Sequence, residues 1–227
     1  MHAAPISHVS LSDKTYDLLK EMIVRWQLQP GQRLIDAEIA LQFGVSRSLV
    51  RNALTTLANE GLVRVSRRGF YVMEFSQQDV RDLLELRRLL EISALEAAIE
   101  STTDDEIGEI EARLAEAQTL LEAGDLEKFY ALDVETHRMI IDKGRNNYTK
   151  KVYANLATIL RMIIRSDFNK HPKISEALQE HRAIFEAWKR HDVKAAKAAL
   201  ERHLARAKER VMENFVKNMS VPIREVV

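Results

Sequence analysis

The stretch LQPGQRLIDAEIALQFGVSRSLVRNALTTLANEGLVRVSRRGFYV, residues 28–72, decides the fold of the N-terminal part of the chain. Apolar residues at helical spacing predict two short helices, over 36–43 and from 46 to about 60, with a Gly-Val turn between them. Gly61 follows at a position where helices favour a left-handed cap. A further amphipathic helix, over about 12–26, precedes the stretch. This order is typical of a helix followed by a helix-turn-helix.

Two β-rich runs end the stretch. LVRV and FYVM, at 62–65 and 70–73, are separated by Ser-Arg-Arg-Gly, which favours a hairpin. A hairpin that follows a helix-turn-helix forms the wing of a winged helix-turn-helix. We therefore predict an N-terminal domain of this type over residues 1–75, with residues 1–10 as a flexible leader.

The second helix of the predicted motif carries its polar residues on one side. Its apolar residues face the core, which leaves on the outer side Arg47, Ser48, Arg51, Asn52 and Thr55. Five arginines lie between residues 44 and 69, against one acid. Local positive charge suits contact with phosphates, and arginines on a helix in the major groove can bind guanine edges. A single exposed arginine is ordinary solvated charge, whereas five on one motif favour binding to double-stranded DNA.

The same stretch resembles the DNA-binding domain of the GntR family of bacterial transcription regulators. It matches the family pattern L-x-P-G-x-x-L, then L-A-x-x-x-G-V-S-R-x-x-V-R-x-A-L-x-x-L-x-x-E-G-L and a glycine-containing wing. With its neighbouring residues, the match covers about 60 residues. The resemblance implies that Arg47 and Arg51 are the main base contacts and that Gly69, at the wing tip, approaches the minor groove. Leu49 stands where proline is common, and Asn52 stands where an acid is common, which could alter the bases read. The DNA-binding residues we expect are Arg47, Ser48, Arg51, Asn52, Arg67, Arg68 and Gly69.

The composition favours a helical protein of the cytoplasm. The chain has 227 residues, with 34 basic and 34 acidic side chains, so its positive charge is local rather than global. There are no cysteines, which excludes disulfides and thiolate metal sites. The N-terminus has no apolar signal region, and no apolar run approaches the roughly 20 residues of a membrane helix. We expect a cytoplasmic protein that makes no contact with membranes.

After residue 73 the pattern becomes purely helical. Ser76 and Asp79 resemble a capping box, and short connections separate the helices that follow, as in an antiparallel bundle. The expected helices cover about 76–100, 103–123, 125–143, 148–166, 175–190 and 192–218. The fold class we predict is therefore mainly α: a winged helix-turn-helix followed by an all-α antiparallel bundle over 76–227.

Four polar residues interrupt the apolar stripes of these helices. Asp133 and His137 fall on one stripe, and His181 and His203 lie in the middle of two others. Because a buried polar group without a partner costs on the order of a few kcal/mol, four in one bundle point to a shared partner. Imidazole and carboxylate ligands without thiolates suit a divalent metal, of which we favour Zn²⁺ or Ni²⁺. The alternative is four core residues that hydrogen-bond without a metal.

Six helices after a GntR-type domain resemble the FadR-type subgroup, whose members carry an FCD ligand-binding domain. The resemblance extends over roughly 77–218. The metal pattern of that subgroup is an acid and a histidine on one helix, followed by histidines on the last two helices. It is matched by the DVETH, EHRAIF and ERHLARA segments, so the resemblance implies that the same four residues bind the metal.

Arg87 is a further charged residue on an apolar stripe. Its spacing from neighbouring leucines places it on the inner side of its helix, where a guanidinium needs an anionic partner. Several members of the subgroup use such an arginine as a carboxylate receptor, which implies that the metal and Arg87 clamp a small organic acid. Glu91, one turn further on, could instead satisfy Arg87 as an intrahelical pair.

These features predict a ligand-responsive transcription regulator, most readily a repressor. Because one recognition helix reads one half-site, we expect a homodimer on a palindromic operator. The alternatives are a metalloenzyme with an appended nucleic-acid domain and a DNA-binding protein whose metal is only structural. The enzyme is disfavoured because no histidine has a glutamate three residues before it and no His-Glu-x-x-His is present. A turnover assay tests the enzyme, and a ligand-dependent change in DNA affinity separates the other two.

Overall fold

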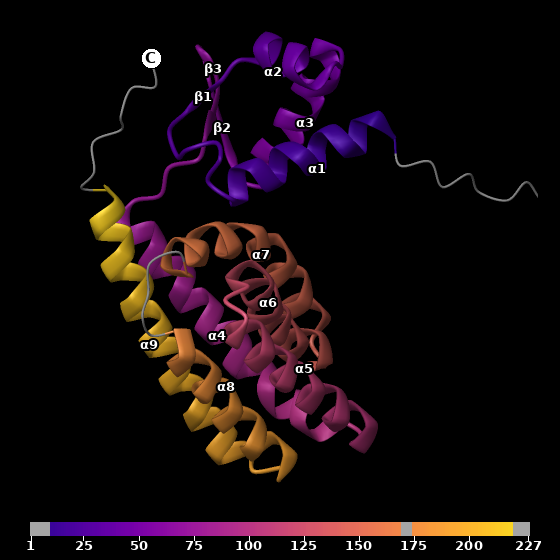
Figure 1. The fold of residues 1–227 in the computed structure, drawn as a ribbon, viewed down its shortest axis with the longest axis vertical. Helices are drawn as coiled ribbons and strands as arrows, with labels where there is room; N and C mark the ends of the chain where they lie inside the picture. Colours follow the sequence, from indigo (N-terminus) through magenta and orange to yellow (C-terminus); the bar gives the residue numbers. More distant parts are fainter. Residues whose placement is uncertain (1–9, 169–173, 220–227) are drawn as a thin grey trace, which may run out of the picture. The chain divides into compact units, whose positions relative to one another are not determined.

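The computed structural model describes residues 10–168 and 174–219, divided between two compact units, Met1–Phe75 and Ser76–Val227. The predicted flexible leader lies outside the described residues except for Ser10, whose side chain caps the first helix. Helices dominate both units, which confirms the mainly α fold class (Figure 1). In the part of the chain that the structure describes, no helix is long and apolar enough to span a bilayer.

Among its described residues, unit 1 combines three helices with a small sheet (Figure 1). The helices are α1 Leu11–Val24, α2 Asp36–Phe43 and α3 Arg47–Asn59. The strands are β1 Arg33–Leu34, β2 Val63–Ser66 and β3 Gly69–Val72, paired antiparallel in the order β1-β3-β2. Ser66 pairs with Gly69, so β2 and β3 form the tight hairpin expected of a wing.

The helix-turn-helix of unit 1 follows from local sequence. Gly44 adopts a left-handed φ of 66° at the end of α2, a conformation that favours glycine. Ser46 then accepts a hydrogen bond from the Leu49 amide and caps α3. The apolar side of α3, including the fully buried Leu54 and Leu57, packs against α1. This packing leaves the polar side of α3 in solvent.

Strand β1 was not expected from the sequence. The segment before α2 contains Pro30 and Gly31, which favour a turn. Two residues of that segment, Arg33 and Leu34, pair with Tyr71 and Phe70 of the wing. A strand of two residues is too short to show the alternating pattern on which a prediction from sequence depends.

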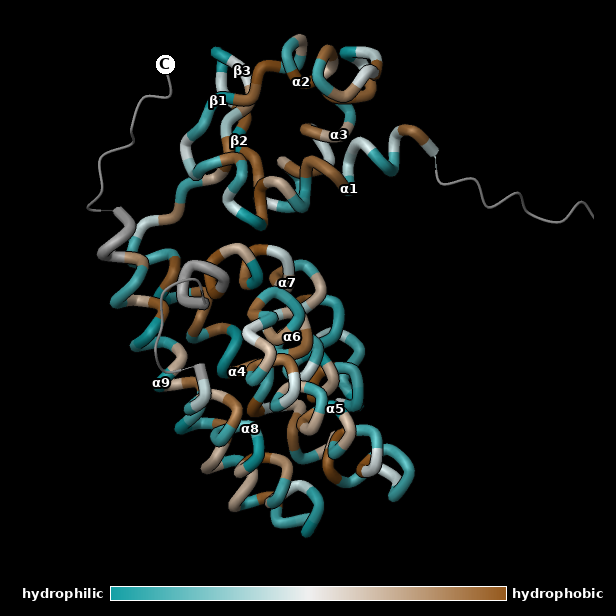
Figure 2. The backbone as a smooth tube through the Cα atoms, viewed as in Figure 1, coloured by the Kyte–Doolittle hydropathy of each residue, from teal (hydrophilic) through white to brown (hydrophobic). Residues whose placement is uncertain are grey.

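Unit 2 is a bundle of six helices among the residues the structure describes (Figure 1). They are α4 Gln77–Ser101, α5 Asp104–Glu122, α6 Leu126–Lys143, α7 Asn147–Phe168, α8 Ile174–Lys189 and α9 Val193–Met219. Hydrophobic and hydrophilic residues alternate along them, as in amphipathic helices (Figure 2). Helix α9 packs along α8 and α4, and α4 also packs against α6 and α7. Helix α4 is therefore central to the bundle.

The core of unit 2 is mostly apolar, but one part of it holds several charged and imidazole side chains. Trp188 and Phe129 are among its largest fully buried side chains, and Trp188 donates a hydrogen bond to Thr102. Charged and imidazole side chains are buried together where α4, α6, α8 and α9 approach one another. They are Arg87, Glu91, Asp133, His137, His181 and His203. Such a cluster is stable only if its members satisfy one another or share a ligand.

Candidate metal centre and nucleic-acid interface

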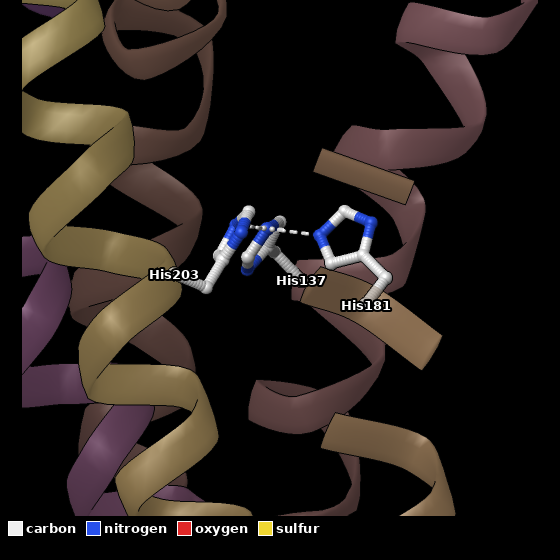
Figure 3. Close-up of side chains that lie close together, drawn as sticks. All are labelled: His137, His181 and His203. Carbon is white, nitrogen blue, oxygen red and sulfur yellow. Dashed lines mark hydrogen bonds between the residues drawn. The ribbon is translucent and has the colours of Figure 1, made fainter. Parts of the chain in front are cut away.

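Three histidines from three helices converge in the core of unit 2 (Figure 3). His137 lies on α6, His181 on α8 and His203 on α9, and each side chain is almost completely buried. The Nε2 atom of His137 lies 3.1 Å from Nε2 of His181 and 3.1 Å from Nε2 of His203. Together they form a group that could hold a metal ion. Each histidine lies on the apolar side of its helix, and that side packs against the neighbouring helices. The three side chains therefore point into the core.

Two carboxylates determine the tautomers of two of these rings. Glu91 Oε2 lies 2.7 Å from Nδ1 of His137, and Glu180 Oε2 lies 2.8 Å from Nδ1 of His203. A carboxylate accepts hydrogen bonds, so both rings carry their proton on Nδ1 and a lone pair on Nε2. The two lone pairs then face each other at 3.1 Å. This arrangement is repulsive for neutral rings alone and suits a cation between them.

Neighbouring arginines favour the ionised form of both carboxyls, against the effect of burial. Burial works against ionisation of Glu180, but hydrogen bonds from His203 and Arg206 outweigh it and lower the pKa of its carboxyl. Glu91 is fully buried, and burial raises the pKa of its carboxyl against the opposing charge of Arg87. Burial likewise works against the charged form of Arg87, yet the charge of Glu91 outweighs it and raises the pKa of the guanidinium. We therefore treat Arg87 and Glu91 as an ion pair.

Burial also sets the protonation of the three histidines. It is the largest influence on each ring and lowers the pKa of His137, His181 and His203 well below the ordinary 6.5. The rings are therefore neutral at neutral pH. Neutral imidazole is the form that binds metal ions.

This protonation predicts a pH dependence for the protein freed of metal with a chelator. Below about pH 6.5 the unfolded histidines bind protons while the folded ones do not, so stability falls as the pH is lowered. The loss should approach about 1.4 kcal/mol per pH unit for each buried histidine. Thermal melting between about pH 7.5 and 5.5 measures it, and His181→Gln should show a shallower decline. Equal melting temperatures across that range would contradict the assignment.

Asp133, the acidic member of the predicted metal set, lies beside the three histidines. It is buried on α6, one turn before His137. Its Oδ1 atom lies 3.5 Å from Nε2 of His181. The carboxylate is therefore within reach of the cluster and could supply an oxygen ligand next to the imidazoles.

Arg87 lies in the same core and is 4% exposed. Its Nε donates a hydrogen bond of 2.7 Å to Glu91 Oε1, so the intrahelical pair considered from the sequence is present. The hydroxyl of Tyr153 donates to the same oxygen at 3.4 Å. Within the described residues, no hydrogen bond involves the two terminal nitrogens of Arg87. Glu91 thus links Arg87 to His137.

The predicted DNA-binding residues of α3 lie on its solvent side. Arg47, Ser48, Arg51 and Asn52 are all exposed. Arg47 and Arg51 both form ion pairs with Asp36 of α2, at 3.1 and 3.2 Å. The Ser48 hydroxyl lies 2.9 Å from that of Ser46.

The predicted wing residues lie at the turn between β2 and β3. The side chains of Arg67 and Arg68 are exposed, and the carbonyl of Arg68 accepts a hydrogen bond from Arg33. Gly69 has a φ of 120°, a conformation that favours glycine. No atom lies within 4 Å of where its Cβ would be, so the tip is open to a partner.

Contacts of three acidic side chains could not be predicted from the sequence. Glu91 was considered only as a partner of Arg87, and its contact with His137 was not foreseen. Glu180 and Asp36 were not singled out. Glu180 precedes a predicted ligand, His181, and Asp36 opens a short helix, but neither position reveals which residue across the fold it contacts.

Two family descriptions match the chain. Residues 11–72 match the bacterial regulatory proteins of the gntR family, and residues 82–206 match the FCD domain. The uncharacterised HTH-type transcriptional regulator YdhC of Bacillus subtilis (strain 168) is 28% identical over 190 residues, which are 83% of this chain and 85% of YdhC. The HTH-type transcriptional repressor RspR of Escherichia coli (strain K12) is 26% identical over 204 residues, 89% and 90% of the two chains.

The fold is similar to that of solved regulators. The structure of E. coli McbR/YncC superposes with a TM-score of 0.78 at 21% identity, covering 92% of this chain and all of the other. The FCD match spans the helices that carry the histidine cluster, and the gntR match spans the winged helix-turn-helix. The chain is a DNA-binding transcriptional regulator, not an enzyme, and belongs to the gntR family with an FCD domain in its C-terminal unit.

Proposed function

We propose that the chain is a ligand-responsive repressor whose FCD domain binds a divalent metal and a small organic acid. Binding of the acid would alter the affinity of the winged helix-turn-helix for its operator. The observation that carries the proposal is the convergence of three neutral imidazoles on one point in the core. We place this activity in the bacterial cytoplasm, in keeping with a regulator that binds DNA.

The donor set supports Zn²⁺ or Ni²⁺ as the metal. His137, His181 and His203 would provide nitrogen ligands, with Asp133 as the adjacent oxygen ligand. Glu91 and Glu180 would orient two of the rings through their Nδ1 protons. Bound there, the metal would supply a Lewis-acidic position for a carboxylate oxygen.

Arg87 supports a carboxylate as the ligand. The guanidinium is buried, and its free edge could make paired hydrogen bonds to a carboxylate. Its link through Glu91 to His137 joins the anion site to a metal ligand. An acid bound to both would contact several helices of the bundle at once.

The short sequence between the wing and α4 supports a coupling between acid binding and DNA binding. Helix α4 carries Arg87 and begins at Gln77, shortly after wing strand β3 ends at Val72. A ligand that binds one arrangement of α4 better than another shifts the protein towards that arrangement. Coupling of this kind is typically about 1–3 kcal/mol. We expect release from the operator when the acid binds.

We further propose a homodimer that binds a palindromic operator. One α3 helix offers a single set of base-contacting side chains, which suits one half-site. A twofold axis would present two such helices to the two halves of a palindrome.

Substitution of Arg87 tests the ligand site. Arg87→Ala should keep bound metal and DNA binding but lose most of the response to the acid, because the carboxylate loses its cationic partner. Titration of operator DNA, with and without small carboxylates, measures the response. Arg88→Ala is the matched control, since Arg88 is the next residue on α4 and pairs with Glu85 nearer the surface.

Removing Arg87 leaves Glu91 buried without its cation, which can cost about 3–5 kcal/mol. Arg87→Lys is therefore a second variant, because it keeps the charge and loses the planar, two-pronged donor. If small carboxylates change the operator affinity of both variants as they do for wild type, Arg87 serves only to pair with Glu91. The anion site would then lie elsewhere.

A purely structural metal is the second candidate function. The ion pair between Arg87 and Glu91 favours it, because Arg87 already has an anionic partner. In that case metal would stabilise the bundle, and no carboxylate would change the affinity for DNA.

A further inference from the structure

One acid contacts both arginines of the recognition helix. Asp36 stands in the first turn of α2, and its side chain is 13% exposed. Its Oδ1 accepts a hydrogen bond of 3.1 Å from Arg47, and its Oδ2 accepts one of 3.2 Å from Arg51. Each arginine donates through one terminal nitrogen, so a single carboxylate spans the two guanidiniums. The arginine side chains are themselves 65% and 61% exposed.

A second contact restrains Arg51. Its guanidinium carbon lies 6.0 Å from the ring centre of Phe70 in β3. Arg51 is therefore placed between an acid from α2 and an aromatic ring from the wing. Side chains from α2, α3 and the hairpin thus meet at Arg51.

Such restraint matters for reading a base sequence. An exposed arginine has many rotamers, and ordering it costs free energy when DNA binds. Recognition of guanine needs the guanidinium fork at a defined position and angle. A carboxylate that already holds the guanidinium in place reduces the free energy needed to order the arginine on a sequence whose guanine matches that position. It gives no such gain on other sequences.

The same carboxylate adds negative charge to a face that meets phosphates. Affinity for any DNA sequence depends on neutralised phosphates and is weakened by a nearby acid. An acid that orders two arginines thus lowers general affinity while favouring the sequence that matches the ordered arrangement.

We propose that Asp36 is a positioning residue that determines DNA sequence specificity by holding the guanidiniums of Arg47 and Arg51. This inference rests on the proposed use of those two arginines in DNA binding. The competing explanation is local: an acid in the first turn of a helix is favoured by the helix dipole. Glu38 distinguishes the two explanations. It also lies in the first turn of α2, but among the described residues it forms no ion pair.

The experiment compares Asp36→Asn with Glu38→Gln, each of which removes one negative charge from the same turn. The probes are a duplex enriched by the full-length wild-type protein from a randomised library and a shuffled duplex of equal length and composition. Fluorescence anisotropy gives both affinities over a range of salt, and thermal melting reports folding.

We expect Asp36→Asn to lower the ratio of the two affinities roughly tenfold while binding the shuffled duplex at least as tightly as wild type. Glu38→Gln should keep the ratio, and both variants should melt near the wild-type temperature. Asp36→Glu keeps the negative charge but lengthens the side chain by one methylene group, so we expect its ratio to lie between the ratios of Asp36→Asn and Glu38→Gln.

An unchanged ratio in Asp36→Asn would overturn the inference, as would an equal fall in Glu38→Gln. If Asp36→Asn melts too low for the titration, Asp36→Glu takes its place. A ratio of the two affinities below that of Glu38→Gln would then support the positioning role of Asp36, and a ratio equal to it would overturn that role. Failure of the proposed DNA face is distinguishable, since in that case Arg47→Ala and Arg51→Ala would bind the enriched duplex as wild type does.

Discussion

His203→Ala should purify with little divalent metal and melt at a lower temperature than the wild-type protein. His203 comes from α9, whereas His137 and His181 come from α6 and α8, so the metal would tie three helices together. A metal present at about 100 times its dissociation constant contributes about 2.7 kcal/mol of stability. Its loss should lower the melting temperature by roughly 5–10 °C. Elemental analysis and thermal melting measure the two effects.

His191→Asn is the matched control. His191 is exposed between α8 and α9 and has a φ of 52°, a conformation that asparagine tolerates. This variant removes a histidine outside the cluster and should retain metal. A wild-type protein that carries no metal after purification and gains no stability from added Zn²⁺ or Ni²⁺ would exclude the site.

Arg51→Ala should bind the operator much more weakly than wild type, and Arg47→Ala should behave similarly. Both side chains are exposed at the start of α3, the part of a recognition helix that reaches base edges. Each lost base contact should cost about 1–3 kcal/mol, and most of the loss should concern the specific sequence. Competition between specific and shuffled duplexes separates this effect from general loss of charge.

Arg138→Ala removes the same charge from α6 of the other unit, where Arg138 pairs with Glu135 and Asp142. It should leave operator affinity unchanged. If the α3 variants also bind the operator as wild type does, a different surface contacts DNA.

Features that depend on the pattern within one helix could be predicted from the sequence. Helical spacing placed His137, His181 and His203 on inner faces, and the structure brings their Nε2 atoms together. The family pattern of the winged helix-turn-helix and the FCD domain was likewise readable, because it depends on residues at fixed spacing. These features depend on local periodicity, which a sequence displays directly.

Contacts between side chains of different helices could not be predicted from the sequence. Glu180 follows the spacing of an ordinary surface acid on α8, yet it bonds His203 of α9. Asp36 likewise contacts two arginines of another helix. Periodicity indicates the face of a helix on which a residue lies, but not which residue of a neighbouring helix it meets. That depends on the crossing of the helices, which is set by packing.

The most direct test of a metal-based ligand sensor is the operator affinity of the wild-type protein, measured with and without metal in the presence of small carboxylates. Mono-, di- and hydroxycarboxylates are added in turn to protein loaded with Zn²⁺ or Ni²⁺ and to protein treated with a chelator. We predict that at least one acid weakens binding of the metal-loaded protein by roughly 5–150-fold and has no effect on the chelated protein. Equal operator affinity with every acid, while metal stays bound, would contradict a sensing role for the metal centre.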